Sequence, residues 1–404
     1  MNRPWDQSLE SLRDAAVAAL RKQAAGIERW LPTVRDAEGR AGRFRWAVET
    51  TRPANVGATN YVLGALTHTG LFDRLIRAED ATAGLAWIDS MDQGGGQFHD
   101  PALLDRRTPG CPEDEAWPSP AMLQAVNHYA LAVRRRYLGD ELEKLGELTP
   151  PPGWPQPDDP PEATLEWIKT RPYDRNAWGA CSHAMRMATL MLQWHRDGRF
   201  GIDPVLEAVR FFYEIQDPDT GLWGTADQPK NVRINGTFKL FPLLREQLDL
   251  PIPYADRIID QVIGEWERPD YDQTASGCDE WDNWYVVALL RPLVPDHRGD
   301  EIERLAAYRI GRTIEVFGRD DGGLSFHPDR SSTHWNGFDM VDGCVNQSDA
   351  QGAATLTRGL NVCVDLAGLS DATSWTGRWR HREGAREPEE IRRKFLDAIP
   401  LASS

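Results

Sequence analysis

Acidic and aromatic side chains alternate in one short stretch of the chain. Asp279, Glu280 and Asp282 are interleaved with Trp281 and Trp284, and an apolar run that predicts a buried helix follows them. Cleavage of a glycosidic bond needs one carboxylic acid to protonate the leaving oxygen and a second carboxylate to activate water or attack the anomeric carbon. Because a tryptophan face suits a sugar ring, this predicted loop is the first catalytic candidate. The alternative is that its acids cap the helix and favour its positive end.

Asp342 and Asp349 form the second pair of catalytic candidates. Both lie in a polar segment ahead of a predicted helix, and Asp349 is equally well explained as the cap of the helix that starts at Ala350. At a catalytic site, burial among tryptophans would raise the pKa of one acid and leave its neighbour ionised. A third acidic stretch, at residues 113–115, is explained as well by a solvated loop.

Positive and aromatic side chains supply candidates for substrate binding. His183 and Arg186 are three residues apart on a predicted helix, so they would share a face and bind a carboxylate, unless His183 is a core residue. Arg233 and Lys239 would add positive charge around an acidic sugar. The remaining candidates lie near the predicted turns, namely Trp117, Trp178, Trp223, Asn235, Trp281, Trp284, His334, Trp335 and Asn336. No group of residues has metal-ligand spacing, so we expect neither a metal nor a cofactor.

Composition and charge exclude several classes of protein. The 404 residues carry a net charge of −16, which argues against a nucleic-acid surface because such a surface needs clustered basic residues. No apolar run approaches the roughly 18 residues of a membrane span, and the N-terminus shows no signal peptide. We therefore expect a cytoplasmic protein with no membrane partner. The 5 cysteines are scattered, which favours reduced thiols, and the 16 tryptophans outnumber the 12 phenylalanines.

Helical patterns of two kinds alternate along the sequence. Some predicted helices are amphipathic, and others are apolar over most of their circumference, which is typical of buried helices. The amphipathic ones lie at residues 121–133, 204–216 and 302–314, and the apolar ones at residues 184–192, 285–290 and 350–369. A similar glycine-bearing turn follows a helix three times, at residues 87–98, 212–224 and 314–326.

These turns indicate degenerate internal repeats, and repeated helical hairpins stack into solenoids or closed toroids. We predict an all-α fold, an (α/α)6-type toroid of helical hairpins in a single domain spanning residues 1–404. Within it, residues 149–162 form a proline-rich strap or linker and residues 372–404 a C-terminal tail. Asparagines also recur where polar loops run into helices, and we expect them to cap the helices or to bind ligand hydroxyls: Asn55, Asn176, Asn235, Asn283 and Asn346.

Two families of α/α toroid share features with the second turn. Gln216, Gly221 and Trp223 resemble the glutamine–tryptophan repeat of squalene cyclases and protein prenyltransferases, and residues 216–223 are also similar to a turn of unsaturated glucuronyl hydrolases and other six-hairpin glycosidases. The resemblance implies inner and outer helices around an axial cavity. The cyclase motif Asp-x-Asp-Asp is absent, and Asp320-Asp321 does not continue into the Asp-Asp-x-x-Asp of terpene synthases. The glycosidase resemblance is therefore the stronger one.

The acidic loops, the tryptophans and the repeats together predict a carbohydrate-active enzyme. It would cleave glycosidic bonds of small oligosaccharides, acidic ones included, by carboxylate acid–base catalysis. One alternative is a terpenoid cyclase or prenyltransferase-like enzyme, in which aromatic faces stabilise carbocations. Another is a polysaccharide lyase, in which a His or Tyr abstracts the C5 proton while Asn or Arg neutralises the carboxylate. A sugar isomerase or a sugar-binding scaffold is the third.

Overall fold

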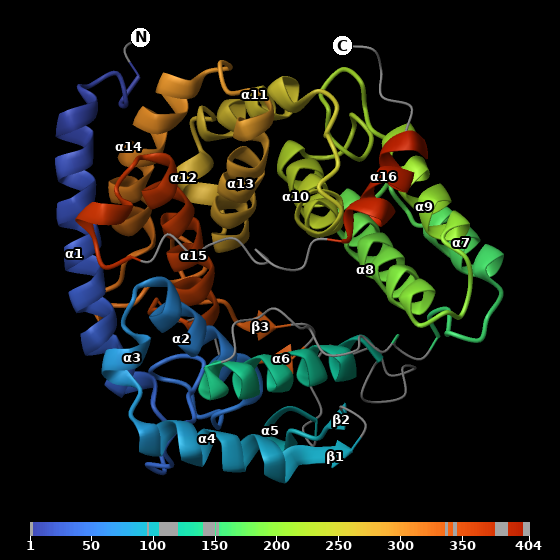
Figure 1. The fold of residues 1–404 in the computed structure, drawn as a ribbon. Coiled ribbons are helices and arrows are strands. Elements are labelled where there is room, and N and C mark those ends of the chain that lie inside the picture. The colour runs from blue at the N-terminus through green and yellow to red at the C-terminus, as the bar shows by residue number, and fades with distance from the viewer. Residues whose placement is uncertain are drawn as a thin grey trace. The chain divides into compact units, whose positions relative to one another are not determined.

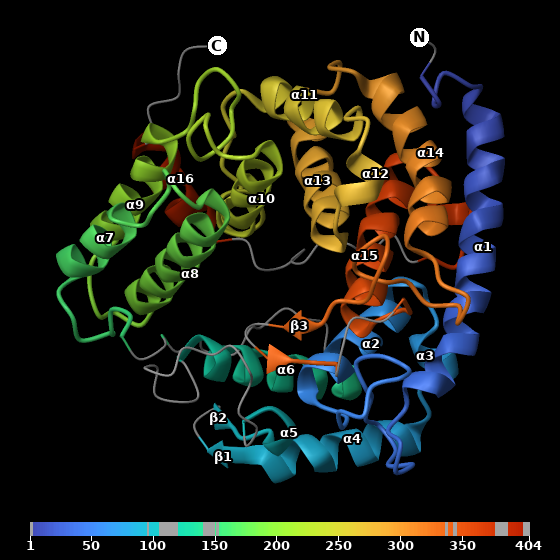
Figure 2. The ribbon, with the colours of Figure 1, turned by 180° about the vertical axis from the view of Figure 1, so that it is seen from behind.

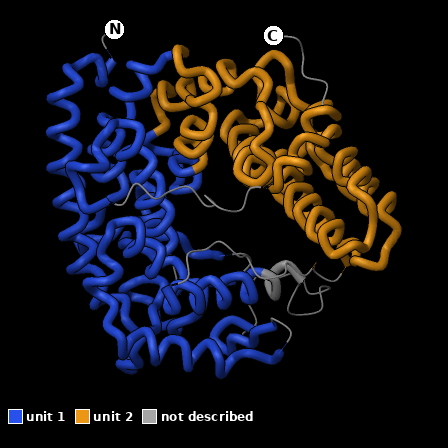
Figure 3. The backbone as a smooth tube through the Cα atoms, viewed as in Figure 1, with its two compact units in different colours: residues 1–146, 272–281, 298–379 blue, residues 147–271, 282–297, 380–404 orange. Residues whose placement is uncertain are grey.

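The protein is mostly helical, as predicted (Figure 1; seen from behind in Figure 2). The computed structural model describes residues 3–94, 97–104, 120–139, 150, 153–335, 338–341, 346–375 and 387–398. Chain contacts divide it into two compact units (Figure 3). Unit 1 comprises residues 1–146, 272–281 and 298–379, and unit 2 comprises residues 147–271, 282–297 and 380–404.

Unit 1 is built around α2 (Val56–His68), which packs against both α15 (Ala350–Leu366) and α6 (Pro120–Leu138). A second layer comes from α14 (Gly299–Phe317), which packs on α15 and on α1 (Leu9–Val34). The smaller elements are α3 (Phe72–Leu75), α4 (Ala78–Met91), α5 (Pro101–Leu104) and α12 (Tyr271–Thr274), with the 3-10 turn Ser370–Ala372. Two short antiparallel pairs complete the unit: β1 (Asp92–Gly94) with β2 (Gln97–Phe98), and β3 (His334–Trp335) with β4 (Phe338–Asp339).

Unit 2 contains a second set of packed helices. Its closest pair is α8 (Ala177–Arg196) and α10 (Lys230–Phe241), and α10 continues into a π-helical turn at Pro242–Gln247. On the outside, α9 (Asp203–Glu214) packs against α7 (Pro161–Lys169) and α16 (Glu389–Ala398). The remaining helices are α11 (Ala255–Trp266), the 3-10 turn Arg291–Leu293, and α13 (Gly277–Leu290), whose residues from 282 onward belong to unit 2.

The predicted glycine turns connect amphipathic helices to buried ones. The turn after α9 closes with a β-bridge between Gln216 and Trp223, and the turn after α14 closes with one between Gly318 and Leu324. At the end of α4, β1 pairs antiparallel with β2, with Asp92 opposite Phe98. The sequence pattern missed a further turn of the same kind after α1, where Arg35 pairs with Phe44. The helix–turn–helix repeat is therefore present in both units.

A buried threonine fixes two of these turns in the same way. The backbone N–H of Phe44 donates to Oγ1 of Thr59 at 3.1 Å, and that of Trp223 donates to Oγ1 of Thr237 at 3.3 Å. Each threonine lies on the buried helix that follows its turn, and all four residues are shielded from water. The two turns therefore share one hydrogen-bonding pattern, although their residues differ.

The asparagine caps were predicted correctly for two helices and wrongly for three segments. The side chains of Asn55 and Asn176 accept from the N–H groups of Ala58 and Gly179, which caps α2 and α8. Asn235 lies inside α10 and Asn283 inside α13, because both helices begin several residues earlier than their apolar pattern indicates. Asn346 precedes α15 by four positions, and Asp349 caps that helix instead.

The proline-rich segment packs on unit 2 where it is described, whereas the C-terminal segment packs on unit 1 up to Trp375 and on unit 2 from Glu387 onward. In the proline-rich segment, the ring of Trp154 lies 4.8 Å from that of Trp167 and 5.1 Å from that of His183. In the C-terminal segment, Glu387 pairs with Arg196 and accepts from the side chain of Gln247 at 3.2 Å, just before α16. Across the described residues, no helix is both long and apolar enough to cross a membrane.

The threonine that fixes each turn makes a testable contribution to stability. Thr59→Val and Thr237→Val keep the shape of the side chain but leave a buried backbone N–H without its acceptor, which costs about 1–3 kcal/mol. Chemical denaturation should show a loss of this size in each variant. Thr59→Ser and Thr237→Ser keep the hydroxyl and serve as controls. Equal stability of the Val and Ser variants would contradict this role.

Candidate functional site

The acidic stretch 279–284 is not a loop, so the sequence prediction was wrong on this point. It forms the first turns of α13, which begins at Gly277. Asp279 accepts from the backbone N–H of Ser276 and from its hydroxyl, each at 2.8 Å, and the Ser276 hydroxyl lies 3.4 Å from the N–H of Asp279. This reciprocal pairing is a capping box. Asp279 thus has the capping role considered as the alternative, while Asp282 and Asn283 do not cap the helix.

Glu280 and Asp282 both lie on α13 but make different ion pairs. Glu280 is buried and pairs with the buried guanidinium of Arg309, which also donates to Asp272 at 2.7 Å. Asp282, also buried, lies 3.8 Å from the ammonium of Lys239. Residues two apart on an α-helix point in nearly opposite directions. These two carboxylates therefore do not face the same space.

Asp349 caps the N-terminus of α15. Its carboxylate is fully buried and accepts from the backbone N–H groups of Gly352 at 2.8 Å, Phe326 at 2.8 Å and Ser332 at 2.9 Å. Asp349 thus has the capping role that the sequence left open, and it also ties two loop segments to the helix. The other predicted acids, Asp342 and residues 113–115, lie outside the described residues, as do Trp117 and Asn336.

Most of the predicted tryptophans pack inside their units. Trp223, Trp281, Trp284 and Trp335 are buried, because a large indole gains most when it is removed from water. Trp284 packs against Trp266 with ring centroids 4.1 Å apart. Trp178 is the exception, with 43% of its surface exposed, and the ammonium of Lys239 lies 5.7 Å from its ring.

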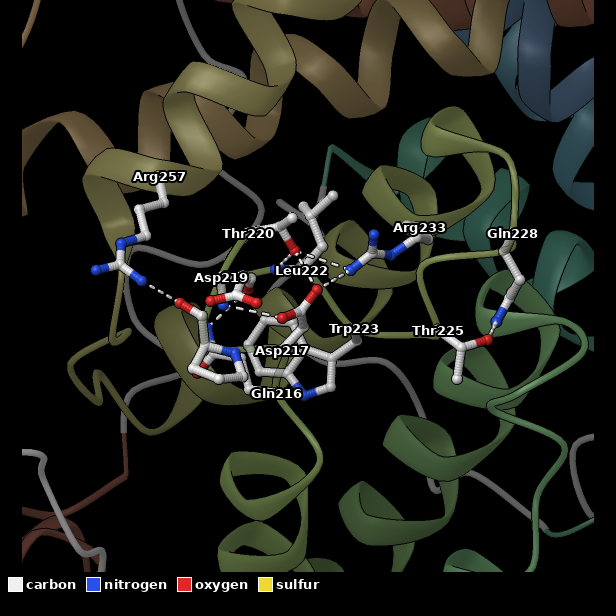
Figure 4. A network of polar contacts seen from close by, with 12 residues as sticks. Gln216, Asp217, Asp219, Thr220, Leu222, Trp223, Thr225, Gln228, Arg233 and Arg257 are labelled. Carbon is white, nitrogen blue, oxygen red and sulfur yellow. Dashed lines mark hydrogen bonds and ion pairs between the residues drawn. The ribbon is translucent and has the colours of Figure 1, made fainter.

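The turn that resembles the glutamine–tryptophan repeat is a structural network (Figure 4). The guanidinium of Arg233 donates to Asp217 at 2.6 Å and to the Thr220 hydroxyl at 2.8 Å. Burial raises the pKa of Asp217, but hydrogen bonds from Thr220, the Asp219 N–H and Arg233 outweigh it and hold the pKa below its usual value. The side chain of Gln216 donates to the carbonyl of Gly221, and the indole of Trp223 donates to that of Phe212.

Arg233 and Trp223 therefore stabilise this turn and are buried, so they are not exposed for ligand binding. Gly221 has φ +74°, and a Cβ atom there would lie 2.6 Å from Ile258, so the turn also requires glycine at this position. Asn235 is buried within α10. The resemblance to toroid families thus rests on residues that shape the fold.

His183 and Arg186 share an exposed face of α8, so His183 is not a core histidine. Partial burial, followed by the nearby charges of Arg186 and Arg171, lowers the pKa of His183. Arg171 stacks over Trp167 at 3.9 Å. In unit 1, His334 is exposed and its Nε2 lies 2.7 Å from the carboxylate of Asp339 in the adjoining strand. Both histidines remain accessible to a ligand.

A different cluster, of which the sequence analysis named only Trp335, lies on buried helices of unit 1. One face of α2 carries Gly57, Tyr61, Gly64 and His68, at the spacing of successive helical turns. The facing side chains come from Tyr129 and Arg136 on α6, Arg358 on α15, and Trp335. We call Tyr61, His68, Tyr129, Arg136, Trp335 and Arg358 the Arg136 site.

Arg136 is the charged centre of this site. Its guanidinium donates to the amide oxygen of Asn60 at 3.3 Å and to the hydroxyl of Thr67 at 3.2 Å. No carboxylate among the described residues lies within ion-pairing distance of it. Burial and then the positive charge of Arg358 lower the pKa of Arg136 to about 10, so it stays protonated at neutral pH.

The guanidinium of Arg136 lies beside a glycine of α2, Gly64. A Cβ atom at Gly64 would lie 3.6 Å from Nη2 of Arg136. Arg358 lies over the ring of the buried Trp281 at 4.3 Å. The site thus contains guanidinium groups supplied by α6 and α15, and the positive charge of Arg358 acts on Arg136.

Tyrosine hydroxyls form the second part of the site. The hydroxyl groups of Tyr61 and Tyr129 are 3.0 Å apart, and the ring of Tyr129 lies edge-on to Trp335 at 4.8 Å. Burial raises the pKa of Tyr61 well above its usual value, and the neighbouring Tyr129 raises it further. Tyr61 is therefore a neutral hydrogen-bond donor at physiological pH.

His68 completes the site as a neutral imidazole. Burial, and then the charges of Arg358 and Arg136, lower its pKa well below the usual value. Its Nδ1 lies 3.3 Å from the hydroxyl of Thr357. The arrangement can bind an anion at Arg136 and can accept or donate protons on either side of it. No group of His, Cys, Asp and Glu within the described part of the chain is placed to hold a metal ion.

The comparisons with known proteins identify no relative from which a function could be inferred. No family model, curated protein or solved structure matches the chain. Two signals in the sequence could have pointed to the site. An arginine stands within an otherwise apolar helix at Arg358, and small and polar residues recur at helical spacing from Gly57 to His68.

The capping role of Asp349 can be separated from a catalytic one. Asp349→Ala leaves three buried backbone N–H groups without an acceptor and should lower the free energy of unfolding by several kcal/mol, at about 1–3 kcal/mol for each lost partner. Asp349→Asn keeps one acceptor oxygen and should lose less. Denaturation curves for both variants test this order. A fully stable but inactive Asp349→Ala protein would instead favour the catalytic role.

Proposed function

We propose that this protein is a carbohydrate-active enzyme that cleaves glycosidic bonds in small acidic oligosaccharides, with the acid group bound at the Arg136 site. The observation that carries the proposal is the half-buried guanidinium of Arg136, whose hydrogen-bond partners are the neutral groups of Asn60 and Thr67. A carboxylate bidentate to this fork would gain charge-assisted hydrogen bonds of the kind that Arg forms best.

The neutral residues of the site suit a sugar ring. Tyr61, Tyr129 and Thr67 offer hydroxyl groups that can exchange hydrogen bonds with sugar hydroxyls. The aromatic edges of Tyr129 and Trp335 provide apolar surface for the C–H faces of a pyranose. Both properties support an acidic sugar over a simple inorganic anion as the ligand.

The repeated turns support the finer fold proposal, an (α/α)6-type toroid, because helix–turn–helix units with equivalent hydrogen bonds occur in both units. The same toroid would suit a terpenoid cyclase, but its chemistry passes through carbocations. A carbocation beside the guanidinium of Arg136 would be destabilised by like charge. The carbohydrate proposal is therefore the better supported one.

The predicted carboxylates bear on how the bond is cleaved. Asp279 and Asp349 are engaged by backbone N–H groups, and Glu280 is paired with Arg309. Hydrolysis by these acids would require them to leave those partners. Asp282 lies 3.8 Å from the ammonium of Lys239. The structural roles of these acids make the Arg136 site the stronger candidate.

The proposal predicts a charge-selective activity. Incubation with a panel of neutral and uronate-containing oligosaccharides should release new reducing ends from the uronates only. Arg136→Met should lower kcat/KM on the acidic substrates by about 10- to 100-fold, because a hydrogen bond to a charged group contributes about 1.5–3 kcal/mol. Arg134→Met, at a half-exposed arginine on the same helix that pairs with Asp89, is the matched control. Activity on neutral sugars alone, or none at all, would overturn the proposal.

A further inference from the structure

Unit 2 presents an exposed tryptophan beside a charged pair. Resting on the proposed function for the class of ligand, we infer that this is a second sugar-binding site, at which Trp178 stacks on a neutral pyranose ring and Lys239 donates to its hydroxyl groups. We call Trp178, Phe238, Lys239 and Asp282 the Trp178 site. All four residues belong to unit 2, whereas the Arg136 site consists of residues of unit 1.

Trp178 leaves a large aromatic surface open to solvent. With 43% of its surface exposed, it is the most exposed tryptophan among the described residues. An indole offers a broad apolar face together with one N–H donor, the combination that suits the C–H face and the hydroxyl groups of a sugar. A lone exposed aromatic side chain is common on protein surfaces. What distinguishes Trp178 is the charged pair beside it.

The ammonium of Lys239 lies between aromatic rings. Its Nζ is 5.7 Å from the ring centroid of Trp178, 4.3 Å from that of Phe238 and 3.8 Å from the carboxylate of Asp282. The last distance makes an ion pair but no hydrogen bond, since N–H···O bonds are about 2.7–3.2 Å long. No other described carboxylate pairs with this ammonium, and only 22% of the side chain is exposed. Its three N–H donors can therefore serve a ligand.

Helix packing places the indole and the ammonium side by side. Gly236 of α10 lies against the start of α8, where a Cβ atom would be 3.0 Å from the backbone of Ala177. Lys239 follows Gly236 by three residues and so shares its face of α10, while Trp178 follows Ala177 directly. The N–H of Ala177 donates to the side chain of Gln228 at 2.8 Å, which fixes this end of α8. Such preorganisation lowers the entropic cost of binding.

The charge of the site favours a neutral sugar over an acidic one. Asp282 is fully buried, and its carboxylate lies close enough to the ammonium of Lys239 to offset its charge. An acidic ligand would gain from Lys239 but would be repelled by Asp282. A sugar hydroxyl accepts from the ammonium without that repulsion. Arg136 differs, because no carboxylate among the described residues pairs with it. The ligand of the Trp178 site is therefore a neutral pyranose residue.

Titration of the full-length protein with sugars tests this charge preference. Arg136→Met removes the proposed acid-binding group, so the two sites can be probed separately. In a panel of neutral trisaccharides of glucose, galactose, mannose and xylose, at least one should bind equally to wild type and to Arg136→Met by calorimetry. It should bind Arg136→Met several-fold more tightly than a galacturonate trisaccharide does. A tighter uronate, or no neutral binding at all, would overturn the inference.

Variants test the two contacts directly. Trp178→Ala should weaken binding of the neutral trisaccharide about 10-fold or more, because it removes the stacking face. Lys239→Met keeps the apolar stem but loses the donors and should weaken binding about 10-fold. Trp167→Ala and Lys169→Met change the same residue types in unit 2, and Lys169 is likewise ion-paired, with Glu207 at 3.3 Å. Wild-type affinity in both Trp178→Ala and Lys239→Met would overturn the site.

Chemical modification provides a measurement that needs no variant. Limiting N-bromosuccinimide should oxidise Trp178 early because of its exposure, and a saturating neutral trisaccharide should slow this oxidation, as mapped by mass spectrometry. An unchanged rate would contradict the inference. The two proposals also fail separately. Cleavage of uronates without any neutral-sugar binding would overturn the Trp178 site alone. Neutral-sugar binding that depends on Trp178, without cleavage of any uronate, would overturn the proposed activity and leave this site in place.

Discussion

Buried backbone groups in the interhelical turns must find hydrogen-bond partners, and this requirement shapes both units. Where an amphipathic helix gives way to a buried one, the chain enters the interior and its N–H groups lose water. A β-bridge satisfies some of them, and a threonine on the next helix satisfies another: Thr59 accepts from Phe44 and Thr237 from Trp223. The start of each buried helix is therefore fixed relative to the turn before it. For α2, this sets which side chains face α6 and α15.

The sequence predicted the class of fold and the turns better than it predicted the site. Periodicity identified buried helices such as residues 350–369, because an apolar circumference is a property of the helix alone. Helix starts were predicted less well. At α13 the apolar run begins several residues after the real start of the helix. Ser276 and Asp279 form the capping box at that start, and the buried polar residues that come before the apolar run interrupt the apolar periodicity. From the sequence alone, a buried acid such as Glu280 is expected to be exposed, because its ion-pair partner, Arg309, is not known.

The site residues were missed for a related physical reason. Carboxylates and tryptophans attract attention in a sequence because their chemistry is conspicuous, yet both types also serve structure. Here Asp279 and Asp349 satisfy helix N-termini, and Trp281 and Trp284 fill the interior. The distinguishing property of Arg136 is its surroundings: an amide, a hydroxyl and another arginine, but no described carboxylate. That property depends on three helices packing together, so it is invisible to any pattern along one of them.

The same surroundings carry an energetic argument for a ligand. A guanidinium that is partly removed from water without a counter-ion destabilises the folded protein, and a second arginine nearby adds to the cost. Replacement by a neutral side chain would relieve it, so stability alone does not account for the cluster. An anionic ligand does account for it, because binding supplies the counter-charge that Arg136 lacks among the described residues.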